Sequence, residues 1–274
     1  MSASQSPVMS ALFVCDINVF GWFVLRYVLN EWGVVVLTPY GLDITESCLT
    51  CKRRVEHAFC DLPTAAMQTF ETIKYATTYP KGAVLFVEGQ EPRGIYVLCK
   101  GRVKLSICST SGKTLITKIA EPGEVLGLSA AVSGKPSELS AETLDPCQIN
   151  FVKRDDFLRF LKEHNDVCLK VAEQLSDKYN SACHEIRTLG LSHCAADKLA
   201  ALLLEWCATN GRASMTQPCV KLALTHEEIA QRIGTSRETV TRLFADLKNR
   251  QILESNASTL LIRNKAALRA MVIT

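Results

Sequence analysis

LTHEEIAQRIGTSRETVTRLFADLKNRQILE, from Leu224 to Glu254, predicts two short helices joined by a tight turn. Thr225–Glu228 and Thr235–Glu238 have the Thr-x-x-Glu spacing of capping boxes, which mark the starts of helices. Gly234 follows the first helix, at the point where a residue with positive φ commonly ends a helix. The pattern predicts a helix-turn-helix, whose second helix presents its N-terminal residues to the major groove of DNA.

The second predicted helix is amphipathic on a helical wheel. Its apolar face carries Val240, Leu243, Phe244 and Leu247. Its polar face carries Arg237, Glu238, Thr241 and Arg242. An ordinary solvated helix is the alternative interpretation. Because two capped helices, a turn glycine and a compact polar face occur together, we interpret the polar face as a DNA-reading surface.

The segment SRETVTR, Ser236–Arg242, resembles the DNA-binding domain of the Crp/Fnr transcription regulators, and so does the spacing of Ala230, Gly234 and Val240. The resemblance extends from about Cys48 to the C-terminus. It implies an α+β protein with an N-terminal β-roll sensor domain like cyclic-nucleotide-binding domains, a long dimerisation helix and a C-terminal winged helix-turn-helix. The expected divisions are an unassigned extension (1–45), cysteine arm and β-roll (46–155), dimerisation helix (156–190) and DNA-binding domain (191–274).

Local patterns favour the same order of elements. Leu62–Tyr75 predicts a short helix, and the glycine-punctuated region Lys81–Phe151 predicts short strands, among them VKLSIC and TLITKI on either side of an STSGK turn. ILESNASTLLIR predicts the wing hairpin. A helical region, Asp155 to about Leu189, carries an apolar stripe that would pack on the β-roll or pair two chains: Val167, Val171, Leu175, Tyr179, Ala182 and Ile186.

The resemblance implies roles for the polar face. Arg237, Glu238 and Arg242 match the family positions that touch bases. Arginine can donate two hydrogen bonds to guanine, and glutamate can accept one from cytosine. The expected partner is double-stranded DNA with GTGA-type half-sites in an inverted repeat, bound by a homodimer that also contacts RNA polymerase. The expected phosphate contacts are Ser236, Thr235 and Thr241. A capping role is the alternative for Glu238.

Cysteine is frequent in the chain, at twelve residues of 274. Cys48, Cys51 and Cys60 precede the β-roll, and Cys147 lies near its end. By resemblance to Fnr-type oxygen sensors, these four would hold a 4Fe–4S cluster that oxygen or nitric oxide destroys, although eight residues between Cys51 and Cys60 exceed the Fnr spacing. Structural zinc, a redox pair and free thiols remain alternatives. The other cysteines, such as Cys99, Cys108 and Cys168, are expected to be small buried hydrophobes.

A cyclic nucleotide is the alternative ligand of the β-roll. Its phosphate-binding loop would carry Gly-Glu followed by Arg-Ser. The corresponding segment of this chain, Glu124–Thr143, is EVLGLSAAVSGKPSELSAET. Here Leu128 follows Gly127 in place of glutamate, and Ser137–Ser140 reads SELS in place of Arg-Ser. Because Glu138 would repel a phosphate, we expect no cAMP binding.

Composition and motifs narrow the class of protein. The net charge is +3, with eight basic and five acidic residues from Leu222 onward. We find no Ser-His-Asp order, H-x-x-x-H pair or G-x-x-x-x-G-K loop, so we predict a regulator and not an enzyme. The alternative class is a winged-helix protein-interaction module. The many cysteines, without a visible signal peptide, indicate a reducing, cytoplasmic setting.

The first 45 residues do not fit the resemblance. Ala11–Leu37 is apolar, but Asp16, Arg26 and Glu31 interrupt it, so we expect no transmembrane helix. An appendage or an incorrectly assigned translation start are the two interpretations, with a membrane anchor as a further alternative.

Overall fold

The computed structural model describes residues 14–18, 24–30, 33–37, 39–42, 44–45, 47–51, 59–191, 194–210, 219–221, 224–256 and 259–272. The N-terminal part contains a three-stranded antiparallel sheet of β1 (Val14–Asn18), β2 (Val24–Asn30) and β3 (Gly33–Leu37), followed by a short 3₁₀ turn, η1 (Pro39–Gly41). Within the described residues, no helix combines the length and apolarity that crossing a membrane requires.

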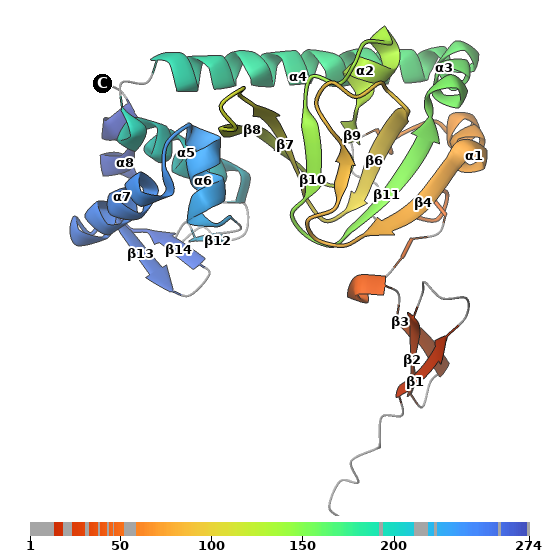
Figure 1. The fold of residues 1–274 in the computed structure, drawn as a ribbon, viewed down its shortest axis with the longest axis horizontal. Coiled ribbons are helices and arrows are strands. Elements are labelled where there is room, and N and C mark those ends of the chain that lie inside the picture. Colours follow the sequence, from red (N-terminus) through yellow and green to blue (C-terminus); the bar gives the residue numbers. More distant parts are fainter. Residues whose placement is uncertain are drawn as a thin grey trace, which may run out of the picture.

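The central domain is a β-roll of two four-stranded antiparallel sheets, with strand orders β5-β10-β7-β8 and β4-β11-β6-β9 (Figure 1). The strands are β4 (Lys74–Tyr79), β5 (Val84–Phe86), β6 (Gly94–Lys100), β7 (Val103–Cys108), β8 (Thr114–Ala120), β9 (Val125–Leu126), β10 (Ser140–Thr143) and β11 (Cys147–Lys153). The strands predicted from VKLSIC and TLITKI are β7 and β8. In the turn between them, Ser109 N–H donates to the Lys113 carbonyl at 2.9 Å, and Gly112 adopts the positive φ of +81°.

Helix α1 (Thr64–Ile73) precedes the roll and is shorter than predicted. The prediction ran to Tyr75, but Lys74 and Tyr75 are extended and pair with Val152 and Phe151 of β11. Sheet pairing therefore outweighs the local helical pattern at this end.

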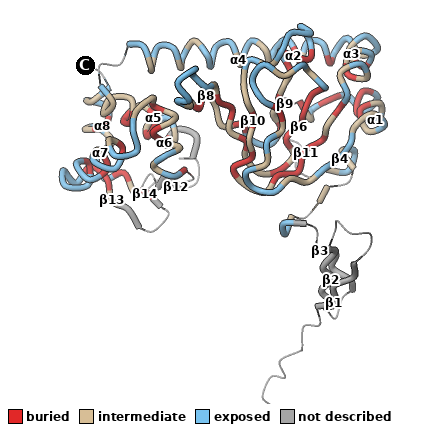
Figure 2. The backbone as a smooth tube through the Cα atoms, viewed as in Figure 1, coloured by how far each residue is buried: buried red, intermediate tan, exposed pale blue. Residues whose placement is uncertain are grey.

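Three further helices belong to the roll: α2 (Leu128–Ser133), α3 (Arg154–Glu163) and α4 (Asn165–Leu191). The predicted helical region is thus two helices, divided where His164 leaves helical geometry with φ −129° and ψ 90°. Helix α4 runs along one side of the molecule from α3 to the C-terminal domain (Figure 1). Most of its length is exposed (Figure 2).

The predicted apolar stripe of α4 divides between two environments. Val167 and Val171 are buried in the core of the β-roll, and Leu175 packs against the same core. Tyr179 and Ile186 are each 70% exposed. The first half of the stripe therefore packs on the chain's own sensor domain, and only the second half is available to another chain.

The C-terminal domain is a winged helix-turn-helix. Its elements are α5 (Ala195–Asn210), β12 (Cys219–Lys221), α6 (His226–Ile233), α7 (Arg237–Asn249), β13 (Leu253–Asn256), β14 (Thr259–Ile262) and α8 (Lys265–Val272). The predicted wing is the β13–β14 hairpin, in a sheet of order β12-β14-β13. Leu199, Leu203, Ile229 and Val240 are fully buried and join α5, α6 and α7 in one core.

Candidate functional site

The start of α6 is a capping box, as predicted. Thr225 Oγ1 accepts a hydrogen bond from Glu228 N–H at 3.2 Å, and Glu228 Oε2 accepts one from Thr225 N–H at 2.7 Å. The helix ends at Gly234, whose φ of +68° is costly for any residue with a Cβ. These two local features set the turn that leads into α7.

The start of α7 differs from the prediction by one residue. Ser236 is the N-cap, and its hydroxyl accepts from Thr239 N–H at 3.2 Å. The predicted Thr235–Glu238 capping box is wrong because the third helical position is occupied by Thr239. Glu238 is one residue earlier, fully exposed. Its pKa is lowered chiefly by a hydrogen bond from its own backbone N–H and then by the Ser236 hydroxyl.

The two faces of α7 match the predicted wheel. The buried residues of this helix are Val240, Phe244 and Leu247, all in the domain core. The exposed face carries Ser236, Arg237, Glu238, Thr241 and Arg242, with Thr235 partly exposed in the preceding turn. All six predicted DNA-contacting side chains therefore lie on or next to one solvent-facing N-terminal surface.

His226 belongs to this surface but was not singled out from the sequence. Its Nδ1 lies 2.9 Å from Thr241 Oγ1, and its ring stacks on Phe244 at a centroid distance of 5.0 Å and an interplanar angle of 2°. Desolvation lowers the pKa of His226, and the charges of Lys248 and Arg237 lower it further. The contact positions Thr241 from α6, which no pattern within α7 could indicate.

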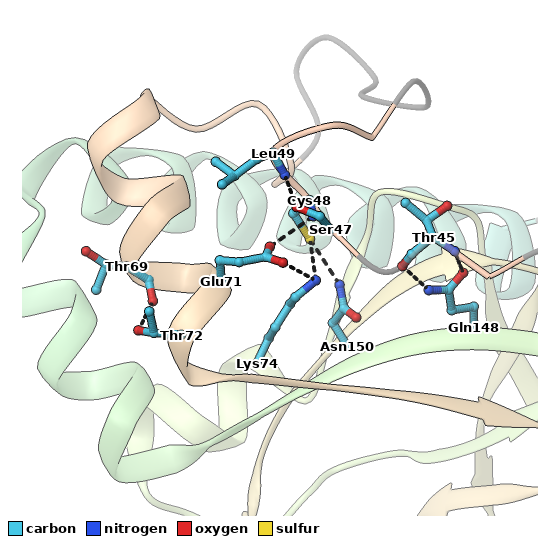
Figure 3. A network of polar contacts seen from close by, with 10 residues as sticks. All are labelled: Thr45, Ser47, Cys48, Leu49, Thr69, Glu71, Thr72, Lys74, Gln148 and Asn150. Atoms are coloured by element: carbon cyan, nitrogen blue, oxygen red, sulfur yellow. Dashed lines mark hydrogen bonds and ion pairs between the residues drawn. The ribbon is translucent and has the colours of Figure 1, made fainter.

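The first cysteine of the arm is held by charged and polar groups. Cys48 N–H donates to Glu71 Oε2 at 2.9 Å, and Cys48 Sγ accepts from Lys74 Nζ at 3.4 Å and from Asn150 Nδ2 at 3.3 Å (Figure 3). Burial raises the pKa of the Cys48 thiol, and the Lys74 ammonium acts in the opposite direction. The cysteine arm is Cys48–Cys60, of which Cys48–Cys51 and Phe59–Cys60 are described.

The structure does not bring Cys147 to the three cysteines of the arm. Cys147 is fully buried inside the roll, where its Sγ donates to the carbonyl oxygens of Arg102 at 3.4 Å and Asp145 at 3.1 Å. Its neighbours Gln148 and Asn150 point the other way, toward Thr45 and Cys48. Across the described ranges, no three His, Cys, Asp or Glu side chains are arranged to hold a metal ion. This structure therefore does not bring Cys48, Cys51, Cys60 and Cys147 together at one place.

Other cysteines depart from the expectation that they are buried. Cys108 and Cys168 are exposed, and Cys99 is partly buried. Cys108 lies at the end of β7 beside the hairpin turn, where its sulfur is 3.3 Å from Thr114 Oγ1. The buried-hydrophobe prediction is wrong for Cys108 and Cys168.

Comparison with known proteins identifies both domains. Residues 76–164 match the cyclic nucleotide-binding domain, and residues 197–271 match the Crp-like helix-turn-helix domain. The chain belongs to the Crp/Fnr family of transcription regulators. It is a DNA-binding regulator of the Crp/Fnr type, and its Crp-like helix-turn-helix indicates double-stranded DNA as its partner.

Relatives within the Crp/Fnr family are distant but cover most of the chain. The global nitrogen regulator of Synechocystis sp. is 28% identical over 193 residues, covering 70% of this chain and 85% of that protein. The cAMP-activated regulator CRP of Pasteurella multocida is 23% identical, covering 67% and 88%. The structure of FixK2 from Bradyrhizobium japonicum shares the fold, with a TM-score of 0.63, 24% identity and coverage of 73% and 97%.

A small cavity of the β-roll lies between β6, α2 and the loops around them. Gly127, Arg93, Phe86, Tyr96 and Ser137 are among the residues that line it. The Ser137 hydroxyl donates to the Leu139 carbonyl at 2.8 Å, while Glu138 is exposed. Arg93 is a cation on the pocket wall that the sequence analysis did not single out.

Proposed function

We propose that this chain acts as a homodimer that binds an inverted repeat with GTGA-type half-sites, using Arg237, Glu238 and Arg242 to read bases. In this proposal Ser236, Thr235 and Thr241 contact phosphates, and the arm thiols report a chemical signal that alters DNA affinity.

The observation that carries this proposal is the exposed N-terminal face of α7. Arg237, Glu238 and Arg242 lie on the side opposite the buried Val240 and Phe244. Because Ser236 caps the helix, the Glu238 carboxylate is not used in a capping box and stays ionised, as its lowered pKa indicates. An ionised carboxylate accepts from the cytosine amino group, and each arginine can donate two bonds to guanine.

Support for the dimer comes from the exposed side of α4. Seven of its residues recur at alternating spacings of three and four, which is the heptad pattern of a two-helix seam: Leu169, Ala172, Ser176, Tyr179, Cys183, Ile186 and Gly190. Leu169 is 65% exposed, while Val167 and Val171 face the roll. Pairing α4 with its twin would cover these apolar side chains and place two recognition helices about a two-fold axis.

Support for signal sensing comes from where the arm is attached. Cys48 is bound to α1, β4 and β11 through Glu71, Lys74 and Asn150. The same sheet packs against the first turns of α4 through Val167 and Val171. A change at the arm thiols would therefore bias the dimer helix, and through it the DNA-binding domains, as a shift between two populations. Oxygen, nitric oxide and general thiol oxidation are the candidate signals, and a small molecule in the β-roll pocket is the alternative.

The proposed DNA binding is tested by selecting bound sequences from random duplexes and measuring the affinity of the enriched sequence by fluorescence anisotropy. We expect an inverted repeat with half-site centres about 10 base pairs apart, or a multiple of this. Arg237→Ala and Arg242→Ala should each weaken binding by about 1–3 kcal/mol, and the loss should be specific to one base pair in each half-site. Arg250→Ala, at the far end of α7, is the matched control and should bind normally.

The same assay distinguishes the DNA-binding regulator from the alternative class, a winged-helix protein-interaction module. A winged helix that binds only proteins would yield no enriched repeat, and the Arg237→Ala, Arg242→Ala double variant would leave its duplex binding unchanged. Enrichment of a repeat that this double variant no longer binds supports the regulator.

A further inference from the structure

Strand β6 presents a cysteine to the arm. Its residues alternate between two cores: Ile95 and Val97 belong to the cluster that also contacts Cys48 and Cys60, whereas Leu98 belongs to the interior of the roll. Side chains of a regular strand alternate, so Ile95 and Val97 share the side that faces the arm, and Cys99 follows Val97 by two residues.

Strand pairing places Cys99 between two residue pairs whose β11 members, Asn150 and Gln148, bond to the arm side of the sheet. Val97 pairs with Asn150, the residue that donates to Cys48 Sγ. The register then shifts: Gln148 pairs with Lys100 and Ile149 with Leu98, so Cys99 is the extra residue of a β-bulge. Such bulges commonly redirect a side chain beside a functional site.

Hydrogen bonds hold the chain to the β-roll just before the arm and at its end. Gln148 exchanges two hydrogen bonds with the backbone of Thr45, at 2.9 and 2.6 Å. At the other end, Phe59 N–H donates to the Gly123 carbonyl at 3.2 Å, and Gly123 N–H donates to the Leu98 carbonyl at 2.7 Å. These bonds link Phe59, which precedes Cys60, through Gly123 to Leu98, the residue before Cys99.

Electrostatic coupling gives the same neighbourhood. Burial raises the pKa of the Cys99 thiol to about 12, and negative charge on Cys60, Cys48 and Cys51 raises it further. The thiol of Cys147 is coupled instead to Asp145 and Arg102, inside the roll. Unlike Cys147, Cys99 is electrostatically coupled to Cys48, Cys51 and Cys60.

We propose that Cys99, in place of Cys147, is the fourth ligand of a four-thiolate metal site formed with Cys48, Cys51 and Cys60. The inference refines the signal-sensing part of the proposed function. Four thiolates suit either zinc or an iron–sulfur cluster, since both are held by soft sulfur ligands. In the described structure these sulfurs are not yet gathered as metal ligands, so binding must draw the arm sulfurs toward Cys99 on β6 as it releases the thiol protons.

The surroundings suit bound thiolates. Lys74 and Asn150 donate to the Cys48 sulfur, and hydrogen bonds to sulfur are one of the ways a protein tunes such a site. Asn150 is 2% exposed, and its Oδ1 is buried without a hydrogen-bond partner in the described structure. The Asn150 amide is thus oriented by its hydrogen bond to the Cys48 sulfur and not by a hydrogen bond to its own oxygen.

Metal content of protein purified without oxygen tests the proposal. One sample is reconstituted with ferrous iron and sulfide, and another is loaded with zinc; iron, sulfide, zinc and the visible spectrum are then measured. We expect about four irons and four sulfides, or about one zinc, per chain. Cys99→Ser should lose the metal, whereas Cys147→Ala and Cys108→Ser should retain it.

Three outcomes overturn the proposal: wild-type protein that takes neither iron–sulfur nor zinc, Cys99→Ser that keeps its full metal content, or Cys147→Ala that loses the metal while its circular dichroism and thermal unfolding stay native. Duplex binding is measured on the same samples. A metal-free protein that binds an inverted repeat removes this site and keeps the regulator. A metal-loaded protein that selects no inverted repeat keeps the metal site and removes the DNA-binding regulator.

Discussion

Arg232 of α6 and Glu185 of α4 form an ion pair that joins the DNA-binding domain to the dimer helix. The same guanidinium donates to two main-chain carbonyls of β8, those of Ile116 at 3.3 Å and Thr117 at 2.5 Å. Side-chain exposure is only 10% for Arg232 and 19% for Glu185, so the pair is little screened by solvent. One side chain therefore links three parts of the protein: the sensor roll, the long helix and the helix that precedes the recognition helix.

Removing this link should uncouple the domains. Arg232→Ala leaves Glu185 and two carbonyls without their donor, and breaking a largely buried pair costs at most about 3–5 kcal/mol. We expect calorimetry to resolve two unfolding transitions in the variant where the wild type shows more cooperative unfolding. Arg250→Ala is the control because its pair with Asp246 is half-exposed and is worth less than about 1 kcal/mol. Identical calorimetric profiles for wild type and Arg232→Ala would contradict the assigned role.

Base reading and helix capping should separate on α7. Glu238→Gln keeps the shape but loses the ionised acceptor, so it should reduce discrimination at one base pair by about 1–3 kcal/mol while lowering the unfolding midpoint less than Ser236→Ala does. Ser236→Ala should instead cost about 1 kcal/mol of stability, because the hydroxyl caps Thr239 N–H. Anisotropy on single-mismatch duplexes and urea unfolding measure the two effects. A Glu238→Gln protein that is destabilised but unchanged in base preference would return Glu238 to a structural role.

Cys183 offers a direct test of the dimer face. It lies between Tyr179 and Ile186 on the heptad pattern, and a parallel two-fold pair of helices places it opposite its counterpart. Mild oxidation with copper phenanthroline should give a disulfide-linked dimer on a non-reducing gel. Cys183→Ser should abolish the dimer band and Cys168→Ser, exposed on the same helix but off the heptad pattern, should keep it. A band that depends on Cys168 alone would assign the interface to another face.

His226 should make the stability of the DNA-binding domain depend on pH. Its pKa is lowered in the folded state, so the unfolded chain binds a proton more readily and stability falls as pH drops below about 6.5. Urea unfolding at about pH 7.5 and about pH 5.5 should therefore show a smaller difference for His226→Gln than for the wild type. His184→Gln, exposed on α4, is the control. Equal pH dependence in wild type and His226→Gln would contradict this assignment.

Local patterns were sufficient for the helix-turn-helix, because its caps, turn glycine and apolar period lie within thirty-one consecutive residues, Leu224–Glu254. The start of α7 was displaced by one residue because Thr235 and Ser236 are both acceptable caps and packing selects between them. His226 was missed because its contact with Thr241 joins two helices. The exposed face of α7 was thus predictable from sequence, apart from His226, which contacts Thr241 from α6.

The ligand set of the arm was not predictable in the same way. Resemblance placed Cys147 near the end of the roll, which is where it lies, but the side of the sheet that a strand residue faces changes with each step along the strand. Cys147 faces the interior and Asn150 faces the arm, while the bulge at Cys99 depends on the pairing of β6 with β11. Only the register, which is a long-range property, shows that Cys147 faces away from the arm while Asn150 faces it.

Helix α4 is a rod that is held against the roll near its start and again at Lys178, whose ammonium donates to the Val125 carbonyl at 2.6 Å. Its twenty-seven residues span about 40 Å at 1.5 Å per residue, and Val167 and Val171 lock its orientation against the roll. Tyr179, Ile186 and Glu185 lie farther along the same rigid element. A rotation of the helix about its axis would therefore move the seam residues and strain the Arg232–Glu185 contact together, so the helix connects the arm side of the roll with the DNA-binding domain.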